Sequence, residues 1–205
     1  MKVNIIFYIL IIFSFLLVNC KKEKPGISDP THNDSVGYFP NNIGMQWKYF
    51  YYDSLSNNSD TVIVEIIGDT SFANDRIARI WEYRFKTTIE RKYIETLGDT
   101  INIYNNLTHQ WINTKFIIPF EIGEKWEVDA FSNDSCYVVE NISLTVLSGI
   151  FSECYVIKET WSFVNDYGQI YTWFVPYIGI VKKHYLGWSF GMGNYYWELM
   201  DYQFF

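Results

Sequence analysis

Cysteines carry the most reactive side chains of this 205-residue chain, which has three of them. Cys136 and Cys154 lie eighteen positions apart, each near the start of a segment that alternates apolar and polar residues. In an oxidising compartment this pair predicts a disulfide, and the alternative is two buried thiols that pack as small apolar groups. Cys-x-x-Cys is absent, so these cysteines do not indicate redox catalysis.

Histidine and serine form no complete catalytic or metal-binding motif. His32, His109 and His184 are far apart in the chain. None of them belongs to His-Glu-x-x-His or to a close cluster with carboxylates, so no metal and no cofactor is expected. Ser189 lies in the letters Gly-Trp-Ser-Phe-Gly, but no histidine follows it to complete the order that an α/β-hydrolase requires.

Paired acids leave a secreted hydrolase open as an alternative. Glu121 with Glu124, or Glu82 with Glu90, could serve as acid and base if the fold brought the two carboxyl groups together. Solvated faces of strands explain the same residues. We therefore assign no catalytic residue.

Aromatic side chains make up 20% of the chain and include eight tryptophans. Those at inward positions of alternating segments, such as Trp47 and Trp126, are expected in the core. Aromatic residues that border loops are the candidates for binding a glycan, an apolar ligand or a protein partner. These candidates are Trp111, Trp188, Tyr195, Tyr196 and Trp197.

The elements that must position these residues are short alternating segments, which begin near Tyr38 and are separated by Gly, Asn, Asp and Ser. About ten such segments predict an all-β domain with an antiparallel meandering sheet, folded as a sandwich or as a partly open barrel. No capped helix of about ten or more residues is expected.

A short repeat divides the domain. Pro40, Ile43, Gly44 and Trp47 recur as Pro119, Ile122, Gly123 and Trp126, every position displaced by 79. In each copy proline holds an extended entry, glycine permits a positive φ, and tryptophan starts a strand. Each copy therefore predicts a corner between a loop and a strand. The domain is then expected to be either two related half-sheets or a barrel with two similar corners.

The first residues predict export. Lys2 is followed by a largely apolar run from Val3 to Val18. This run is shorter than the roughly 20 apolar residues of a spanning helix, so residues 1–19 are predicted to be a cleaved signal peptide.

The end of that run, Leu17-Val-Asn-Cys20, resembles the bacterial lipobox, although Asn19 stands where Gly, Ala or Ser is usual. The resemblance implies lipidation of Cys20 and attachment to a membrane, because two or more acyl chains hold a protein firmly. Residues 20–37 are predicted to be a flexible tether and residues 38–205 a single β domain. Lys21 resembles the residue after the cysteine in lipoproteins forwarded to the outer membrane, which implies that location in the cell envelope.

Four segments together resemble a diffuse group of uncharacterised secreted proteins and envelope lipoproteins of Bacteroidetes-like bacteria. They are FPNNIGMQWKY (39–49), IPFEIGEKWEV (118–128), GIFSECYVIKE (149–159) and WFVPYIGIVKKHY (173–185). The group has no established activity. The resemblance therefore implies a location in the cell envelope and a β architecture, and it implies no catalytic residues.

Asp-Ser or Asp-Thr followed by an aliphatic residue occurs four times and resembles the O-glycosylation sequon of Bacteroides-type envelope proteins. The acceptors would be Ser35, Ser54, Thr61 and Thr100. Turn chemistry before a strand gives the same letters, so both interpretations stay open.

Charge limits the partners. The formal net charge is −7, and an acidic domain repels phosphate backbones, so nucleic acid is not expected. The sequence favours a non-enzymatic lipoprotein whose β domain binds a protein, a glycan or an apolar ligand. A hydrolase and a structural or assembly component of an outer-membrane complex are the alternatives.

Overall fold

The computed structural model describes residues 35–108, 111–128, 134–163, 166–187 and 194–204. The predicted signal peptide, Cys20 and most of the predicted tether lie outside the described residues. The described chain opens with a short helix, α2 (Ser35–Tyr38), so helical structure begins within the last residues assigned to the tether. No helix in the described part of the chain is long and apolar enough to cross a membrane.

Strands make up the rest of the fold, which confirms the all-β prediction. The described residues form twelve strands: β1 (Gln46–Asp53), β2 (Asn58–Ser71), β3 (Ile77–Arg84), β4 (Ile89–Leu97), β5 (Thr100–Tyr104), β6 (Thr114–Ile117), β7 (Lys125–Glu127), β8 (Ser135–Val146), β9 (Gly149–Phe163), β10 (Asp166–Val175), β11 (Gly179–Gly187) and β12 (Tyr195–Gln203). The three-residue β7 is too short to show alternation, but it contains Trp126, where the repeat predicts the start of a strand.

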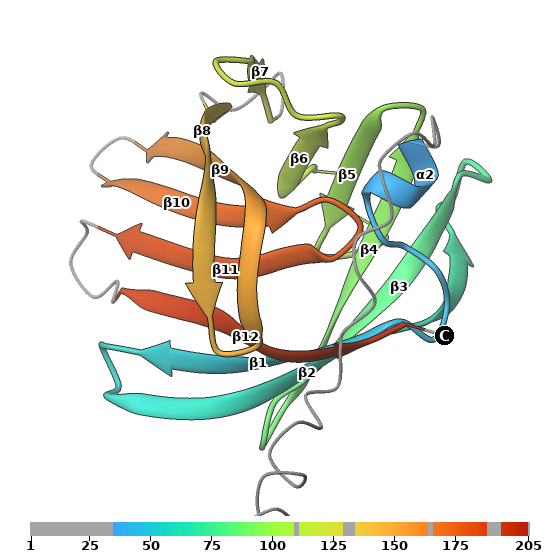
Figure 1. The fold of residues 1–205 in the computed structure, drawn as a ribbon. Coiled ribbons are helices and arrows are strands. Elements are labelled where there is room, and N and C mark those ends of the chain that lie inside the picture. The colour runs from blue at the N-terminus through green and yellow to red at the C-terminus, as the bar shows by residue number, and fades with distance from the viewer. Residues whose placement is uncertain (1–34, 109–110, 129–133, 164–165, 188–193, 205) are drawn as a thin grey trace, which may run out of the picture. The chain divides into compact units, whose positions relative to one another are not determined.

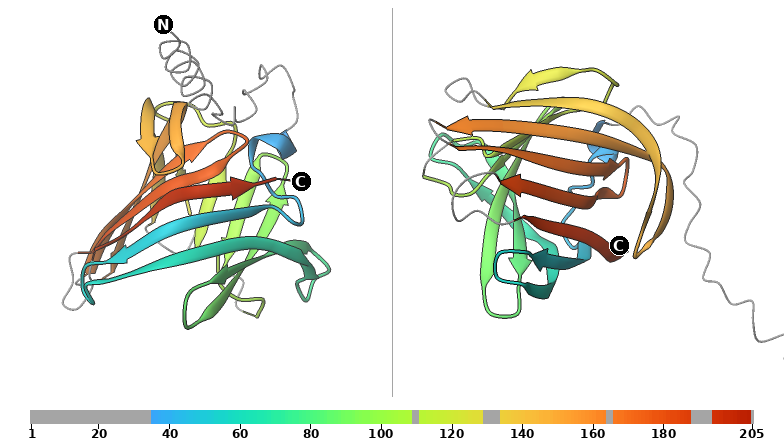
Figure 2. Two further views of the ribbon diagram at one scale, coloured as in Figure 1. Left: turned by 60° about the horizontal axis from the view of Figure 1, so that its bottom comes forward. Right: turned by 90° about the vertical axis from the view of Figure 1, so that its left-hand side faces the viewer.

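One antiparallel sheet contains all twelve strands, in the order β6-β5-β4-β3-β2-β1-β12-β11-β10-β9-β8-β7. It curls until it is nearly closed into a barrel (Figures 1 and 2). Strands β1–β6 form one meander and β7–β12 the other, and the pairing of β1 with β12 joins them. The displacement of 79 that relates the two sequence motifs also relates the first half of the sheet to the second, strand by strand.

The two corners predicted from the repeat have the same geometry. Gly44 has a φ of 90° and Gly123 a φ of 87°, a region of backbone conformation that favours glycine. The amide of Gly44 donates to the carbonyl of Ile66 at 2.8 Å, and the amide of Gly123 donates to the carbonyl of Val138 at 2.9 Å. Each corner thus fastens the start of a strand to the next strand of its half.

The ends of the sheet meet through a side chain. The indole nitrogen of Trp126, on β7, donates to the carbonyl oxygen of Lys115, on β6, at 2.8 Å. The two edge strands are not neighbours in the ladder of backbone hydrogen bonds. The second tryptophan of the repeat therefore bridges the seam that the backbone leaves open.

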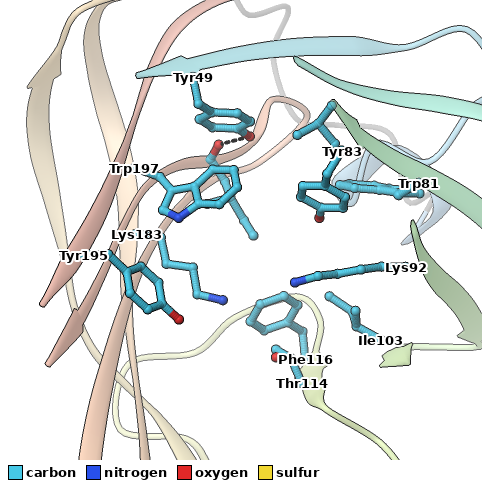
Figure 3. A pocket seen from close by; sticks show the side chains of 12 residues that line it. Tyr49, Trp81, Tyr83, Lys92, Ile103, Thr114, Phe116, Lys183, Tyr195 and Trp197 are labelled. Carbon is cyan, nitrogen blue, oxygen red and sulfur yellow. Dashed lines mark hydrogen bonds between the residues drawn. The ribbon is translucent and has the colours of Figure 1, made fainter. Parts of the chain in front are cut away.

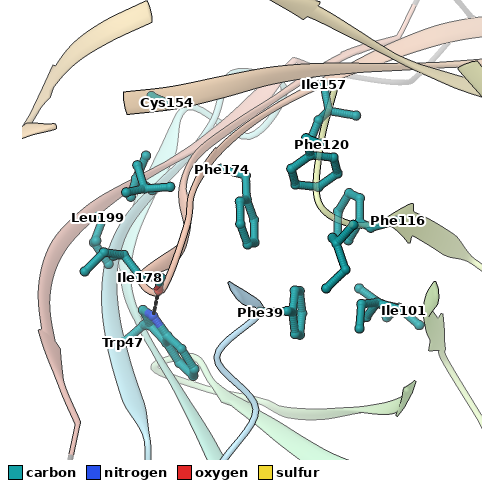
Figure 4. Packing of buried hydrophobic residues seen from close by; sticks show 14 of the residues in the cluster. Phe39, Trp47, Ile101, Phe116, Phe120, Cys154, Ile157, Phe174, Ile178 and Leu199 are labelled. Carbon is teal, nitrogen blue, oxygen red and sulfur yellow. Dashed lines mark hydrogen bonds between the residues drawn. The ribbon is translucent and has the colours of Figure 1, made fainter. Parts of the chain in front are cut away.

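An aromatic core fills one part of the sheet's interior (Figure 4). Phe39 stacks on Phe174 with ring centroids 5.9 Å apart, and Trp47 stacks on Trp81 at 4.9 Å. The indole nitrogen of Trp47 donates to the carbonyl oxygen of Ile178 at 2.7 Å, so its polar atom has a partner inside the core. Trp126 stacks on Phe120 at 6.3 Å, and both Trp47 and Trp126 are buried, which confirms that they belong to the core.

Candidate ligand-binding site

The sheet does not pack solidly throughout. A cavity of about 100 Å³ remains inside it, lined by side chains from both halves (Figure 3). Its lining consists of Tyr49 on β1, Val64 on β2, Trp81 and Tyr83 on β3, Lys92 on β4, Ile103 on β5, Thr114 and Phe116 on β6, Ile180 and Lys183 on β11, and Tyr195 and Trp197 on β12.

Aromatic rings hold one wall of the cavity in place. The ring of Trp197 makes edge contacts with Tyr49 at 5.8 Å and with Tyr83 at 6.1 Å between centroids. The hydroxyl of Tyr49 donates to the carbonyl oxygen of Ile180 at 2.7 Å. Burial raises the pKa of both Tyr49 and Tyr83, so their hydroxyl groups stay neutral. The wall is therefore apolar with a few fixed hydroxyls.

Two lysines project into this apolar space from opposite sides. Lys92 comes from the first half of the sheet and Lys183 from the second, and their amino groups point toward one another (Figure 3). The ammonium of Lys92 lies 5.1 Å from the centroid of the Tyr83 ring, a cation–π contact. Burial, and then the charge of Lys183, lower the pKa of Lys92 to about 8. Burial likewise lowers the pKa of Lys183.

Glu159, on β9, is an acidic group that acts on both lysines, and Glu90, on β4, also acts on Lys92. Only 8% of Glu159 is exposed, and burial raises the pKa of its carboxyl to about 7. The charges of Lys183 and Lys92 oppose that rise. The thiol of Cys136 lies 3.9 Å from its Oε2. Burial thus penalises the charged forms of Lys92, Lys183 and Glu159 alike.

A polar hollow of about 460 Å³ adjoins the cavity, because Lys92 and Tyr195 line both. Its other lining residues are Glu90, Arg91, Asn105 and Asn113. The amide nitrogen of Asn105 donates to the side-chain oxygen of Asn113 at 2.8 Å. A molecule with an apolar end and a polar end would find both environments side by side here.

The structure separates the five aromatic binding candidates. Tyr195 and Trp197 line the cavity, while Tyr196, between them on β12, contacts Phe50 and Tyr52, which are not in the cavity wall. This follows from the alternation of side chains along a strand. Trp111 is 77% exposed, and Trp188 lies outside the described residues.

The predicted disulfide is wrong in this structure, where Cys136 and Cys154 are both free and buried. In the β8–β9 ladder Cys136 pairs with Glu159, whereas Cys154 pairs with Ile142. Six positions along β8 separate the two pairs, roughly 20 Å at about 3.3 Å per residue. A disulfide requires Cα atoms within about 7 Å. Burial raises the pKa of both thiols, so the alternative of two inert apolar groups fits.

The described O-glycosylation candidates follow aspartates that make local hydrogen bonds. Asp53 accepts a hydrogen bond from the amide of Leu55 at 2.9 Å, and Asp60 accepts one from the amide of Thr61 at 2.7 Å. The hydroxyl of Thr100 donates to Asp99 at 3.2 Å. Turn chemistry accounts for Asp53 and Asp99, whereas Asp60 and Thr61 lie inside β2. Ser54 and Thr61 are exposed, and glycosylation stays a prediction. The side chain of Ser35 lies outside the described residues.

Among the acids considered for hydrolysis, Glu82 is held by two arginines. Glu82 accepts hydrogen bonds from Arg91 at 2.9 Å and from Arg84 at 3.3 Å. The Arg91 hydrogen bond is the largest cause that lowers the pKa of Glu82. His109 and Ser189 lie outside the described residues. Within the part of the chain that is described, no group of three His, Cys, Asp or Glu side chains could hold a metal ion.

Comparison with known proteins gives distant structural matches. No protein-family model matches the chain, and no curated protein matches it. A candidate lipoprotein from Parabacteroides distasonis is 14% identical, with a TM-score of 0.41. A candidate exported protein from Bacteroides fragilis with a YmcC-like fold is also 14% identical, with a TM-score of 0.43. Each match covers 81% of this chain and 98% of the other.

Proposed function

We propose that this protein is a lipid-anchored envelope protein whose β domain binds a small apolar ligand inside the curved sheet. The aromatic-lined cavity of about 100 Å³ is the observation that carries the binding role. Small-molecule sites are typically concave and mostly apolar, with a few polar groups that orient the ligand. The cavity has this composition, with Lys92 and Lys183 as its charged groups.

The anchor rests on the N-terminal sequence. Cys20 directly follows the apolar run that predicts a signal peptide, and lipidation there would tether the β domain to a membrane. Lys21 supports the outer membrane as that location. The anchor would leave the cavity in the aqueous phase of the envelope, where a small solute could reach it.

Binding is favoured over hydrolysis by the chemistry of the wall. None of the described residues that line the cavity carries a carboxylate, whereas a glycosidase needs two facing carboxyl groups. Glu82 is paired with arginines instead. A glycan or protein partner would need an exposed apolar patch. The position of the cavity inside the curved sheet favours a small ligand over both.

Filling the cavity tests the binding role. Ile103 lines it and is 7% exposed, so Ile103→Phe adds volume where a ligand would lie. We expect butyrate or butyramide to bind the full-length protein, detected by saturation-transfer NMR, and the Ile103→Phe variant to lose that signal. Ile150→Phe is the matched control, because Ile150 is 74% exposed. Binding that persists in Ile103→Phe, or fails for both ligands in the unaltered protein, would contradict the proposal.

A further inference from the structure

The amines of the cavity show what kind of ligand it suits. Lys92 and Lys183 lie on strands of different halves and direct their amino groups into the same space (Figure 3). Among the described residues neither lysine has a carboxylate within ion-pair distance. Charges that are withdrawn from water in proteins are mostly paired, so two half-buried ammonium groups without an ion pair leave a place for an anion.

Nearby carboxylates make a singly charged anion the better fit. Glu159 acts on both lysines and Glu90 acts on Lys92, so the two amines already have negative charge around them. One carboxylate on a ligand would relieve the repulsion that remains between the two ammonium groups. A doubly charged phosphate would leave the interior with an uncompensated negative charge, which burial disfavours.

The size of the cavity limits the apolar part. An engineered cavity of about 150 Å³ binds benzene, so a smaller one suits an alkyl group of about three to five carbons. The cavity of this protein is about 100 Å³. A short chain would lie between the rings of Tyr83, Phe116 and Trp197, and the carboxylate would lie at Lys92, where the cavity joins the polar hollow.

We propose that this cavity binds a short-chain monocarboxylate, with its alkyl group among the aromatic rings and its carboxylate between Lys92 and Lys183. This inference rests on the proposed binding function and narrows it to one class of ligand. It assigns the recognition of charge to two residues from different halves of the sheet, so both halves are needed for the site.

A pair of isosteric ligands tests the inference. Butyrate and butyramide have the same number of non-hydrogen atoms and differ in charge. The full-length protein in detergent is titrated with each, and the dissociation constants are measured by ligand-observed NMR. We expect butyrate to bind about tenfold more tightly than butyramide, as expected for a hydrogen bond to a charged group. Lys183→Met should remove most of this preference, so that the dissociation constants of the two ligands become similar.

The neighbouring lysine provides the matched control. The ammonium of Lys182 lies 5.3 Å from the centroid of the Trp173 ring, outside the cavity wall, so Lys182→Met should keep the preference for butyrate. Lys92→Met gives a second test if Lys183→Met does not fold. Equal affinities for the two ligands in the unaltered protein would overturn the inference and leave the proposed function standing. Absence of binding by both would overturn the proposed function as well.

Discussion

At the scale of single residues, Glu159 and the two lysines set the electrostatics of the interior. Each of these groups is buried enough that its charged form is penalised, and the opposite charges only partly offset the cost. Tyrosines in the same wall stay neutral, which keeps the surroundings apolar. The site is therefore sensitive to the removal of any one of the three charges.

The carboxyl of Glu159 should make stability depend on pH. It loses its proton near its ordinary pKa of 4.5 in the unfolded chain, but near 7 in the folded protein, because burial raises the pKa. Between these pH values the folded state holds more protons, so the free energy of unfolding falls as pH rises. Relative to the unaltered protein, Glu159→Gln should gain stability across this window, by up to about 3 kcal/mol.

Urea unfolding at several pH values from about 4 to 8 measures this gain. The exposed Glu140→Gln on the adjacent β8 is the control for removing a surface carboxylate. A stability difference between Glu159→Gln and the unaltered protein that is the same at every pH would contradict the assignment.

Sequence reasoning identified part of this site. Tyr195 and Trp197 were recognised because they begin a strand after a loop, and both line the cavity. Lys92 and Lys183 were missed, since a lysine in an alternating strand ordinarily faces solvent. The direction of each lysine side chain depends on which face of its strand turns inward. In the pairing of β10 with β11 the register shifts between Trp173 and Phe174, so simple alternation does not predict the inward face near Lys183.

At the scale of elements, the repeated corner was predictable and the pairing of cysteines was not. The spacing of proline, glycine and tryptophan is a local signal, and Gly44 and Gly123 both have the positive φ that this signal predicts. The disulfide depended on the register of β8 against β9, which two irregularities shift. Local chemistry specifies a corner, whereas register is set by the packing of the whole sheet.

The corner glycine should be costly to replace. Gly123 has a φ of 87°, and an added Cβ would meet nothing within 4 Å, so the expected cost comes from the backbone alone. We expect Gly123→Ala to lower the free energy of unfolding by about 1–2 kcal/mol. Gly37→Ala is the control, because its added Cβ would make ordinary contact with Tyr177 at 3.5 Å without a positive φ. Equal losses in denaturant unfolding of the two variants would contradict this explanation.

At the scale of the whole molecule, two six-stranded halves share one interior. The β1–β12 pairing joins them on one side, and the Trp126 indole bridges β6 and β7 on the other. The meander of about ten strands and its two halves were visible in the sequence because alternation and repeats are local patterns. The cavity was not, since it depends on how twelve strands close around side chains from both halves.

The proposed anchor also belongs to this scale, because lipidation of one residue would determine where the whole molecule resides. We expect Cys20→Ala to abolish the incorporation of labelled fatty acid and to release the β domain into the soluble fraction, since acyl chains supply the membrane affinity. Metabolic labelling and fractionation measure both effects. Full membrane retention of the variant would contradict lipidation at Cys20.

Whether the cavity is a ligand site is tested most directly by intermolecular nuclear Overhauser effects in the full-length protein with bound butyrate. Binding in the cavity predicts contacts from the alkyl protons to the methyl groups of Ile103 and Ile180, which line it. The exposed methyl groups of Ile150 should show none. Butyrate that contacts only exposed methyl groups, or none at all, would contradict the binding role.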